Sequence, residues 1–444
     1  MRFGTDGLRG VAGAELTPEL ALALGRAAAR VLGAGRWFVG RDPRRSGALL
    51  SAALTAGLAA EGAEVADLGV LPTPGVAFWA AAEGAPAAVI SASHNPFADN
   101  GIKLFGPGGR KLSDAVERQI EAELHAGPVG LQTGLRSGVD LGTASPLEGA
   151  GRYGDHLVAS LEGRKLSGLK VVLDTANGAG AAVGPAVLRR LGCDVVQVLG
   201  ADPDGLNINE GCGSTQLGPL AEAVVATGAA VGIALDGDAD RCLAVDHRGA
   251  TVDGDQLLAL LAVDLRAQGR LDHDTLVVTV MSNLGLHQAM AATGVRLETT
   301  SVGDRYVLDR MEEGGFVLGG EQSGHVIFRQ LATTGDGLLT ALQVLDVVQR
   351  SGRPLAELAA VVQRLPQVLL NVRVAGSAKE ALAGSHAVRA AVAGVESELG
   401  ASGRVLLRPS GTEPLVRVMV EAPTDAEAHQ AARRIAEVVE ASLA

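Results

Sequence analysis

Two short stretches of this 444-residue chain carry side chains whose types and spacing suit catalysis. In Ser91-Ala-Ser-His-Asn-Pro96 the hydroxyl of Ser93 follows an apolar run, and Asp236-Gly-Asp-Ala-Asp-Arg241 places three carboxylates within five residues. Carboxylates about 4 Å apart repel by about 4 kcal/mol at an effective dielectric of about 20, so three pairs cost on the order of 12 kcal/mol. A divalent cation removes that repulsion, and oxygen-only ligands favour Mg²⁺ over Zn²⁺. A metal beside a serine, without a Ser-His-Asp pattern, favours phosphoryl transfer through a phosphoserine.

The aspartate cluster lies between two apolar runs, so a solvated hairpin tip is the alternative to a metal site. An EF-hand is excluded, because its sixth position needs Gly and is Arg241, and its twelfth needs Glu and is His247. Alternate positions let Asp236, Asp238 and Asp240 converge from one side of a tight loop. We therefore predict that these three residues are the metal ligands.

The surroundings of Ser93 differ from those of a hydrolase nucleophile. The sequence is not Gly-x-Ser-x-Gly, and a capping or turn serine is the alternative interpretation. His94 is adjacent, so the geometry of a general base does not follow from the sequence. Lys103 is one of only five lysines and follows the motif closely. Since a lysine near charged groups can release its proton and an arginine cannot, Lys103 is a candidate for proton transfer.

A polar loop near the C-terminus combines neutral and cationic donors between two predicted strands. Ser410, Thr412 and the amide of Gly411 supply neutral donors, and Arg408 and Arg417 supply bidentate positive ones. This composition is typical of a phosphate site, with an ordinary hairpin loop as the alternative.

A second polar loop, Gly320-Glu-Gln-Ser-Gly-His325, offers the donors and acceptors that sugar hydroxyls require, and a plain polar loop is the alternative. The glycines of Gly178-Ala-Gly180 have the wrong spacing for a dinucleotide fingerprint, and no Gly-x-x-x-x-Gly-Lys-[Ser/Thr] occurs. These features argue against a nucleotide-binding P-loop enzyme.

The overall composition narrows the class of partner. A formal net charge of −12 and an aromatic content of 2% argue against nucleic acid and anionic membranes as partners. No run of 18 apolar residues occurs, the N-terminus has no apolar targeting segment, and the three cysteines form no CxxC. We expect a cytoplasmic protein with reduced thiols.

Apolar runs alternate with Ala/Leu-rich stretches, as in layered α/β proteins. Thr17-Pro18-Glu19 predicts the start of a helix that ends near Leu32. Further predicted elements are strands at 37–40, 64–68, 87–91, 231–235, 275–280 and 315–318 and a helical segment at 336–349. A Gly/Ser/Pro-rich stretch at 134–151 indicates a first domain boundary. The strand at 368–374, the helix at 378–398, the hairpin at 404–421 and the helix at 425–443 predict a small α+β module.

Five motifs occur in the order found in the α-D-phosphohexomutase family, which the chain resembles over nearly its whole length. They are Phe3–Gly10, Ser91–Pro96, Asp236–Arg241, Gly320–His325 and Arg408–Pro414. The resemblance implies three related mixed α/β domains plus a smaller C-terminal α+β domain around a central cleft. We expect these domains at 1–150, 151–250, 251–365 and 366–444.

The resemblance also implies a role for each motif. Ser93 would carry the phosphoryl group, and Mg²⁺ would be held by that phosphate with the three aspartates. Charge and proton transfer would be supported by Arg241 and Lys103, with Arg9 and His94 lining the site. The sugar would be bound by Glu321 and Ser323, with His325, Gly303 and Asp304 nearby. The phosphate that is not reacting would be held by Arg408, Ser410, Gly411, Thr412 and Arg417.

Within the family, three features are most similar to bacterial members that act on glucosamine phosphates: Phe3-Gly-Thr-Asp-Gly7, the Glu321-Gln-Ser-Gly-His325 loop and Thr333-Thr-Gly-Asp-Gly337. The implied reaction interconverts glucosamine 6-phosphate and glucosamine 1-phosphate through glucosamine 1,6-bisphosphate, with glucose 1,6-bisphosphate as a possible activator. The product would feed UDP-N-acetylglucosamine and cell-wall precursor synthesis.

Three alternatives stay open at this point. The chain could act on mannose and glucose phosphates, act as a metal-dependent sugar phosphatase, or bind sugar phosphates without catalysis. We expect a small sugar phosphate as the partner, no nucleic acid or membrane, and a monomer or homodimer.

Overall fold

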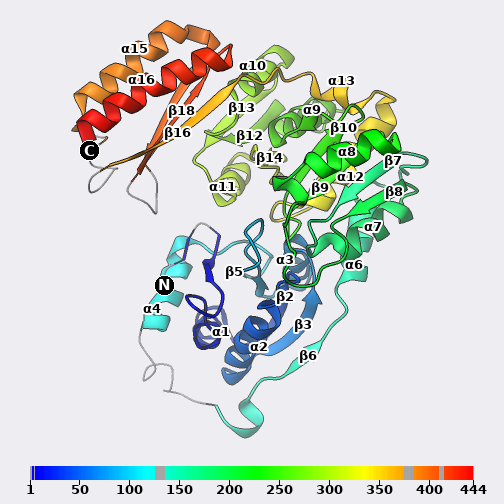
Figure 1. The fold of residues 1–444 in the computed structure, drawn as a ribbon. Helices are drawn as coiled ribbons and strands as arrows, with labels where there is room; N and C mark the ends of the chain where they lie inside the picture. The colour runs from blue at the N-terminus through cyan, green and yellow to red at the C-terminus, as the bar shows by residue number, and fades with distance from the viewer. Residues whose placement is uncertain are drawn as a thin grey trace. The chain divides into compact units, whose positions relative to one another are not determined.

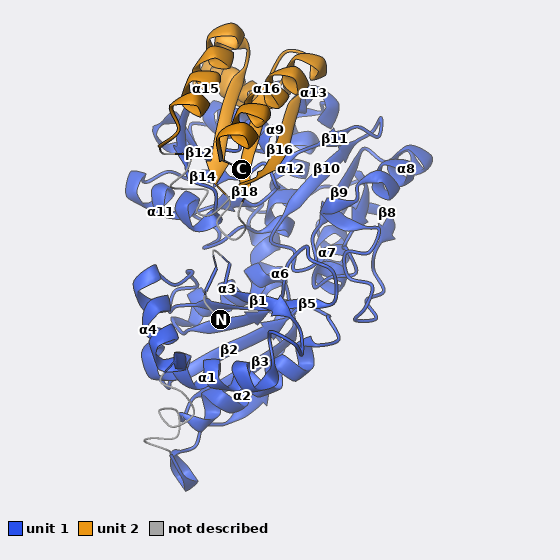
Figure 2. Cartoon of the chain, turned by 60° about the vertical axis from the view of Figure 1, so that its left-hand side comes forward, with its two compact units in different colours: residues 1–281, 295–361 blue, residues 282–294, 362–444 orange. Residues whose placement is uncertain are grey.

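A computed structural model describes residues 3–4, 6–125, 136–374, 382, 384–409 and 415–443. The chain divides into two compact units (Figure 2). The first comprises Met1–Met281 and Val295–Val361, and the second comprises Ser282–Gly294 and Val362–Ala444. Within the first unit, mixed sheets alternate with helices (Figure 1).

The first sheet has the strand order β1-β5-β4-β2-β3-β6 and carries the segment that contains Ser93. Strands β4, β2, β3 and β6 are parallel to one another, and β5 pairs antiparallel with both β4 and the edge strand β1. The strands are β1 (Leu8–Val11), β2 (Arg36–Arg41), β3 (Glu64–Val70), β4 (Ala87–Ile90), β5 (Asp99–Phe105) and β6 (Ala144–Pro146). Its helices are α1 (Pro18–Leu32), α2 (Gly47–Ala60), α3 (Thr73–Glu83) and α4 (Asp114–His125).

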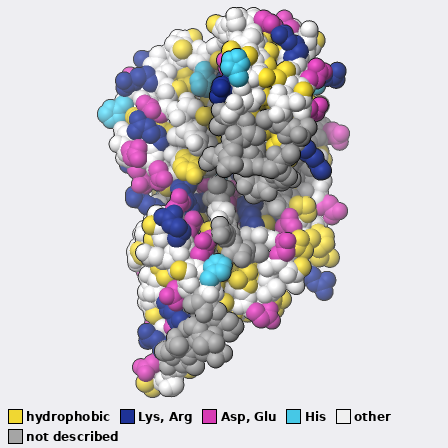
Figure 3. Space-filling view, turned by 90° about the vertical axis from the view of Figure 1, so that its left-hand side faces the viewer, with side chains coloured by type: hydrophobic (Ala, Val, Ile, Leu, Met, Phe, Trp, Pro, Cys, Tyr) yellow, Lys and Arg dark blue, Asp and Glu magenta, His cyan; other side chains and the backbone are white. Residues whose placement is uncertain are grey.

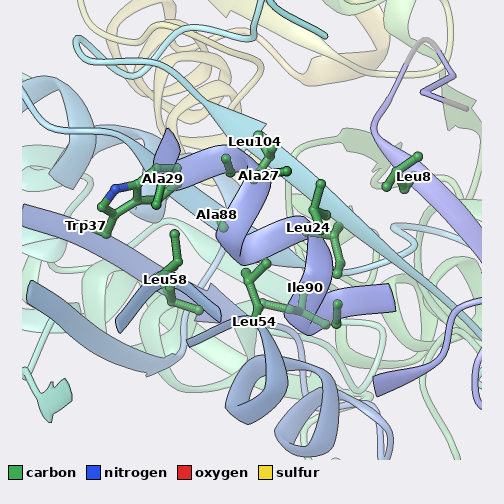
Figure 4. Close-up of a cluster of buried hydrophobic side chains, with 14 of the residues drawn as sticks. Leu8, Leu24, Ala27, Ala29, Trp37, Leu54, Leu58, Ala88, Ile90 and Leu104 are labelled. Carbon is green, nitrogen blue, oxygen red and sulfur yellow. The ribbon is translucent and has the colours of Figure 1, made fainter. Parts of the chain in front are cut away.

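Local chemistry explains where α1 begins. The Thr17 side chain accepts a hydrogen bond from the Leu20 amide, and Pro18 occupies the first helical position, where its missing N–H costs nothing. The apolar face of α1, including Leu24, packs with Leu54 of α2 and Ile90 of β4 in one buried cluster (Figure 4). The predicted helix start and the strand leading to Ser93 are confirmed.

A second sheet, ordered β11-β10-β9-β7-β8, carries the aspartate loop between β9 and β10. Its strands are β7 (Lys170–Asp174), β8 (Asp194–Leu199), β9 (Val231–Leu235), β10 (Cys242–Asp246) and β11 (Thr251–Val252). The neighbouring helices are α6 (Ala150–Ala159), α7 (Gly180–Arg190) and α8 (Gly218–Thr227). Every residue of β9 is buried, so the strand fixes the position of the loop that follows it.

A third sheet, ordered β13-β12-β14-β15, carries the polar Gly320–His325 loop between β14 and β15. Its strands are β12 (Thr275–Thr279), β13 (Arg296–Thr300), β14 (Leu318–Gly320) and β15 (Val326–Phe328). The helices of this part are α9 (Gly254–Ala267), α11 (Asp304–Gly314), α12 (Gly337–Ser351) and α13 (Leu355–Ala359).

The second unit contains an antiparallel sheet, ordered β16-β18-β17. Its elements are α10 (Leu284–Thr293), β16 (Gln367–Arg373), α15 (His386–Leu399), β17 (Arg404–Pro409), β18 (Leu415–Glu421) and α16 (Asp425–Leu443). Valines of the sheet and alanines of α16 form its buried core.

The structure corrects two expectations. The strand predicted at 315–318 begins only at Leu318, because Gly315 adopts a φ of 70° and caps the end of α11. The stretch at 134–151 is not only a linker: its described part contains β6, which pairs with β3 of the first sheet, while 134 and 135 lie outside the described residues. A short edge strand such as β6 is not predicted from the sequence, because turn-forming residues surround it.

Among the described residues, the distribution of surface charge in Figure 3 gives no sign of a strongly basic binding face, as the negative net charge predicts. On the face shown in Figure 3, basic and acidic side chains of the described residues are interspersed, without a large patch of one sign. No helix in the described ranges is long and apolar enough to cross a membrane. The three cysteines are buried free thiols.

Candidate active site

Ser93 lies just after β4, in the turn that leads to β5, and its backbone is held from two sides. Its φ is 53°, a left-handed conformation that is costly for a residue with a side chain. The Ser93 carbonyl accepts hydrogen bonds from the guanidinium of Arg44 and the amide of Asn209, both at 2.9 Å. The surrounding structure therefore maintains a turn that the local sequence alone would not favour.

A buried charge network in the segment just after β2 supports this turn. The Arg44 guanidinium lies 2.9 Å from the carboxylate of Asp42, which also accepts a 2.6 Å hydrogen bond from the Ser91 hydroxyl. The same guanidinium donates to the carbonyl oxygens of Asn95 and Asp99. Arg44 thus ties several carbonyls of the serine turn to one fixed cation.

The three predicted ligands Asp236, Asp238 and Asp240 are buried and converge. One carboxylate oxygen from each lies within 4.8 Å of the others. Oδ1 of Asp238 and Oδ1 of Asp240 are buried without a hydrogen-bond partner among the described residues. Burial, followed by the charges of Asp240 and Asp238, raises the pKa of Asp236 well above its usual value. Three carboxylates that converge in this way, with two buried oxygens that accept no hydrogen bond from the described residues, fit a hard divalent cation.

The nucleophile candidate adjoins this cluster. The Ser93 hydroxyl donates to Oδ2 of Asp236 at 2.5 Å. The two loops also approach each other through their backbones, because a Cβ placed on Gly237 would lie only 2.6 Å from the Ser93 carbonyl oxygen. Glycine is therefore needed between the first two aspartates for the serine turn and the aspartate loop to meet.

Lys103, on β5, neutralises part of the cluster. Its Nζ lies 2.8 Å from Asp238, 3.3 Å from Asp240 and 3.0 Å from Asp6. Burial lowers the pKa of Lys103, but the carboxylates of Asp238, Asp6 and Asp240 outweigh burial and raise it well above its usual value. Lys103 is therefore held as a cation. Thr73, at the start of α3, donates a further 2.6 Å hydrogen bond to Asp238.

A pocket of about 370 Å³ opens beside these groups. Among the candidate residues, Arg9, His94 and Arg241 line it. Nδ1 of His94 lies 3.2 Å from the Ser93 hydroxyl. Burial, together with the charges of Arg241 and Arg9, lowers the pKa of His94 to about 4, so its imidazole is neutral near pH 7.

Residues from the start of α11 and from the loop between β14 and β15 complete the pocket wall. Gly303, Asp304, Glu321 and His325 line it, and the Gly303 amide donates to Oε1 of Glu321 at 3.1 Å. The hydroxyl of Ser323 is buried without a hydrogen-bond partner in the described part of the chain, and it does not line this pocket. Four of the five sugar-site candidates therefore surround one space.

His325 lies between two carboxylates. Its Nε2 is 3.3 Å from Asp304 and its Nδ1 is 3.8 Å from Asp240. Burial lowers the pKa of His325, but Asp304 and Asp240 outweigh burial and raise it to about 10. The Gly335 amide also faces Nε2, at 3.0 Å, and can donate to it only when that nitrogen carries no proton. The carboxylates on both sides favour the cationic ring, which then donates to Asp304.

The predicted phosphate site belongs to the second unit. Arg408 and Arg417 stand opposite each other on β17 and β18. Burial and the charge of Arg417 lower the pKa of Arg408, as expected where two cations share a site without an anion. Ser410, Gly411 and Thr412 lie outside the described residues.

Comparison with protein-family models covers most of the chain. The models of phosphoglucomutase/phosphomannomutase alpha/beta/alpha domains I, II and III match residues 1–128, 151–249 and 253–365, and that of the C-terminal domain matches 369–438. The chain belongs to the phosphoglucomutase/phosphomannomutase family. The predicted fold class, three α/β domains plus a smaller C-terminal domain, is confirmed.

Individual members of the family are similar along their whole length. A phosphoglucosamine mutase of Saccharopolyspora erythraea is 57% identical, with 99% of both chains covered. A solved family structure from Burkholderia thailandensis has a TM-score of 0.80 at 25% identity, covering 99% of this chain and 97% of that one. The N-acetylphosphoglucosamine mutase of Aspergillus fumigatus, solved with GlcNAc-6P and magnesium, shares the fold with a TM-score of 0.71 at 18% identity, covering 100% and 96%.

Four residues of this candidate site are not predicted from the sequence. Asp6 stands inside the N-terminal motif Phe3–Gly10, and its acidic side chain is the signal that could have found it. Lys111 is one of the five lysines but lies outside the five motifs. Arg44 and Thr73 carried no signal, because their importance comes from contacts with distant segments.

Proposed function

We propose that this chain interconverts glucosamine 6-phosphate and glucosamine 1-phosphate by phosphoryl transfer through Ser93. The observation that carries the reaction class is the Ser93 hydroxyl, 2.5 Å from Asp236 in a buried triad of carboxylates. The choice of amino sugar is supported by the name of the Saccharopolyspora erythraea relative.

Asp236, Asp238 and Asp240 are proposed to hold Mg²⁺ together with the phosphate on Ser93. Bound there, Mg²⁺ would neutralise charge on the phosphoryl oxygens. The two unbonded carboxylate oxygens and the raised pKa of Asp236 support this ligand set.

The serine acts as donor and acceptor in turn. Phosphorylated Ser93 would transfer its group to O1 of glucosamine 6-phosphate, giving the 1,6-bisphosphate, and regain the O6 group after that intermediate has reoriented. Lys103 and Arg241 would place positive charge near the transferred group, and as cations they would support proton transfer at the sugar oxygens by stabilising negative charge there rather than by accepting the proton. Arg9 and His94 would line the space in which the sugar turns. Glucose 1,6-bisphosphate is the alternative activator.

The remaining candidates bind the substrate without reacting. Glu321 and Ser323 would bind sugar hydroxyls, with His325, Gly303 and Asp304 beside them. The distal phosphate would be held by Arg408, Ser410, Gly411, Thr412 and Arg417. Neutral donors with flexible arginines suit a phosphate that arrives in two sugar orientations.

We also propose the domain boundaries, the location and oligomeric state of the protein, and the use of its product. The four domains would span 1–150, 151–250, 251–365 and 366–444. The protein would work in the cytoplasm as a monomer or homodimer, without nucleic acid or membrane partners, and its product would supply UDP-N-acetylglucosamine and cell-wall precursor synthesis.

The test is turnover of glucosamine 6-phosphate by phosphorylated protein with Mg²⁺. We expect glucosamine 1-phosphate without steady release of inorganic phosphate, and loss of this turnover in Ser93→Ala but not in Ser137→Ala, an exposed control. Steady phosphate release would indicate a phosphatase. Rapid turnover of glucose or mannose phosphates, without glucosamine 1-phosphate, would overturn the assigned substrate.

A further inference from the structure

Lys111 bridges two acidic residues at the wall of the 370 Å³ pocket. Its Nζ lies 2.6 Å from Asp6, in the N-terminal motif, and 2.6 Å from Asp304, the first residue of α11. Only 11% of the Lys111 side chain is exposed. Burial lowers the pKa of Lys111, but Asp304 and Asp6 outweigh burial and raise it, so the side chain is a cation.

These ion pairs are part of a closed ring. From Asp304 it continues through His325 to Asp240, and from Asp240 through Lys103 back to Asp6, with distances between 2.6 and 3.8 Å. Acidic and basic side chains alternate around it. The members are Asp6, Lys111, Asp304, His325, Asp240 and Lys103. The ring joins the aspartate loop to the segment that faces the sugar.

Asp304 connects this ring to the Gly320–His325 loop, the candidate sugar loop. Its neighbour Gly303 adopts a φ of 131° and donates its amide to Glu321. Asp304 also contacts His325, which belongs to the same Gly320–His325 loop. A shift of the Asp304 carboxylate would therefore move both ends of the sugar loop.

Lys111 is not needed to hold its own segment in place. The adjoining Gly109 carbonyl accepts a 2.6 Å hydrogen bond from Thr333, and Arg110 pairs with Glu312 of α11 at 2.9 Å. Arg305 of α11 pairs with Glu117 of α4 at 2.6 Å. The pairs of Arg110 and Arg305 connect the 110–125 segment with α11, the Thr333 bond holds Gly109 separately, and none of these residues lines the pocket. The double ion pair of Lys111 is the one that faces the substrate space.

We propose that Lys111 is a positioning residue for sugar recognition, which fixes Asp304 and, through it, the Gly320–His325 loop. The inference rests on the proposed function, since it concerns the same pocket. Loss of the Lys111 ammonium leaves the Asp304 carboxylate without its closest cation, so the sugar loop loses its link to the N-terminal motif through Asp304 and keeps only the ring's longer path through Asp240 and Lys103. The aspartate loop keeps its own ion pairs with Lys103.

The experiment compares Lys111→Met with Arg110→Met, its matched control. Arg110 is the preceding residue, is 59% exposed, and pairs across the same junction without lining the 370 Å³ pocket. We expect KM for glucosamine 6-phosphate to rise at least about tenfold in Lys111→Met and less than about threefold in Arg110→Met. The Mg²⁺ concentration for half-maximal rate should stay within about twofold in both.

Lys111→Gln is the milder variant if Lys111→Met does not fold, because its amide still donates to one carboxylate. We expect its KM to rise about three- to tenfold. An unchanged KM in a folded Lys111 variant, an equal rise in Arg110→Met, or an equal change in Mg²⁺ dependence would overturn the proposal. If the unaltered protein turns over only glucose 1-phosphate, the proposed substrate fails, and the same comparison with glucose 1-phosphate still decides the role of Lys111.

Discussion

Replacing Arg44 with methionine should destabilise the first sheet and disorder the serine turn. The Arg44 side chain is fully buried, pairs with the equally buried Asp42, and donates to the carbonyls of Ser93 and Asn95. Methionine has a comparable length and no donor. Removing one partner of a buried ion pair costs about 3–5 kcal/mol, because the other charge stays buried without its counterion. We expect a destabilisation of about this size.

Tryptophan fluorescence during urea unfolding measures the loss of stability in the part of the chain that contains the first sheet. The chain has two tryptophans, and both belong to the first sheet and its helices: Trp37 on β2 and Trp79 on α3. With a urea dependence of about 1–3 kcal/mol per M, the transition midpoint of Arg44→Met should fall by at least about 1 M. Arg45→Met is the control, because Arg45 is the next residue and is exposed.

A second substitution separates the lost ion pair from a general packing defect. Adding Asp42→Asn to Arg44→Met removes the buried charge that has lost its counterion, so the double variant should be more stable than Arg44→Met alone. A midpoint for Arg44→Met equal to that of Arg45→Met would refute the reasoning. A double variant less stable than Arg44→Met would refute it as well.

Three further outcomes follow from the same geometry. Gly237→Ala should lower kcat at least about tenfold, because its Cβ would lie 2.6 Å from the Ser93 carbonyl, whereas Gly218→Ala, with open space around its Cβ, should keep full turnover. Chelation with EDTA should abolish turnover, and added Mg²⁺ should restore it. Burial raises the pKa of Glu61, but hydrogen bonds from two α1 arginines outweigh burial and lower it. This stabilisation is complete above the unfolded pKa of about 4.3 and is lost as pH falls through the lower folded value; urea midpoints from pH 3 to 7 should show a shallower acid loss in Glu61→Gln.

The parts of the site that could be predicted from the sequence are those set by local pattern. Ser93 follows a fully apolar strand, and Asp236, Asp238 and Asp240 follow another, so each side chain emerges at a strand end whatever the rest of the fold does. The start of α1 at Thr17 is local in the same sense, since its capping bond spans three residues. Such features need only backbone geometry and the burial of one strand.

The parts that could not be predicted depend on which strands become neighbours. Asp6 meets Lys103 because β1 pairs with β5, and nothing in either segment specifies that pairing. Thr73 and Asp238 are 165 residues apart, yet their side chains lie 2.6 Å apart. The strand expected at 315–318 failed for a different reason: the left-handed Gly315 ends α11, and helix termination took precedence over β propensity.

The aspartate loop is less repulsive in the folded protein than its sequence alone predicts. Three isolated carboxylates would repel by about 12 kcal/mol, but Lys103 contacts two of them, so the protein itself offsets part of their mutual repulsion. What remains is concentrated on Asp236, whose pKa is raised, and on two carboxylate oxygens without donors. Because Asp236 is also the residue that contacts the Ser93 hydroxyl, the carboxyl that least favours ionisation lies beside the nucleophile. Lys103 therefore stabilises the charges of Asp238 and Asp240, while a further cation next to the serine would favour the ionised form of Asp236.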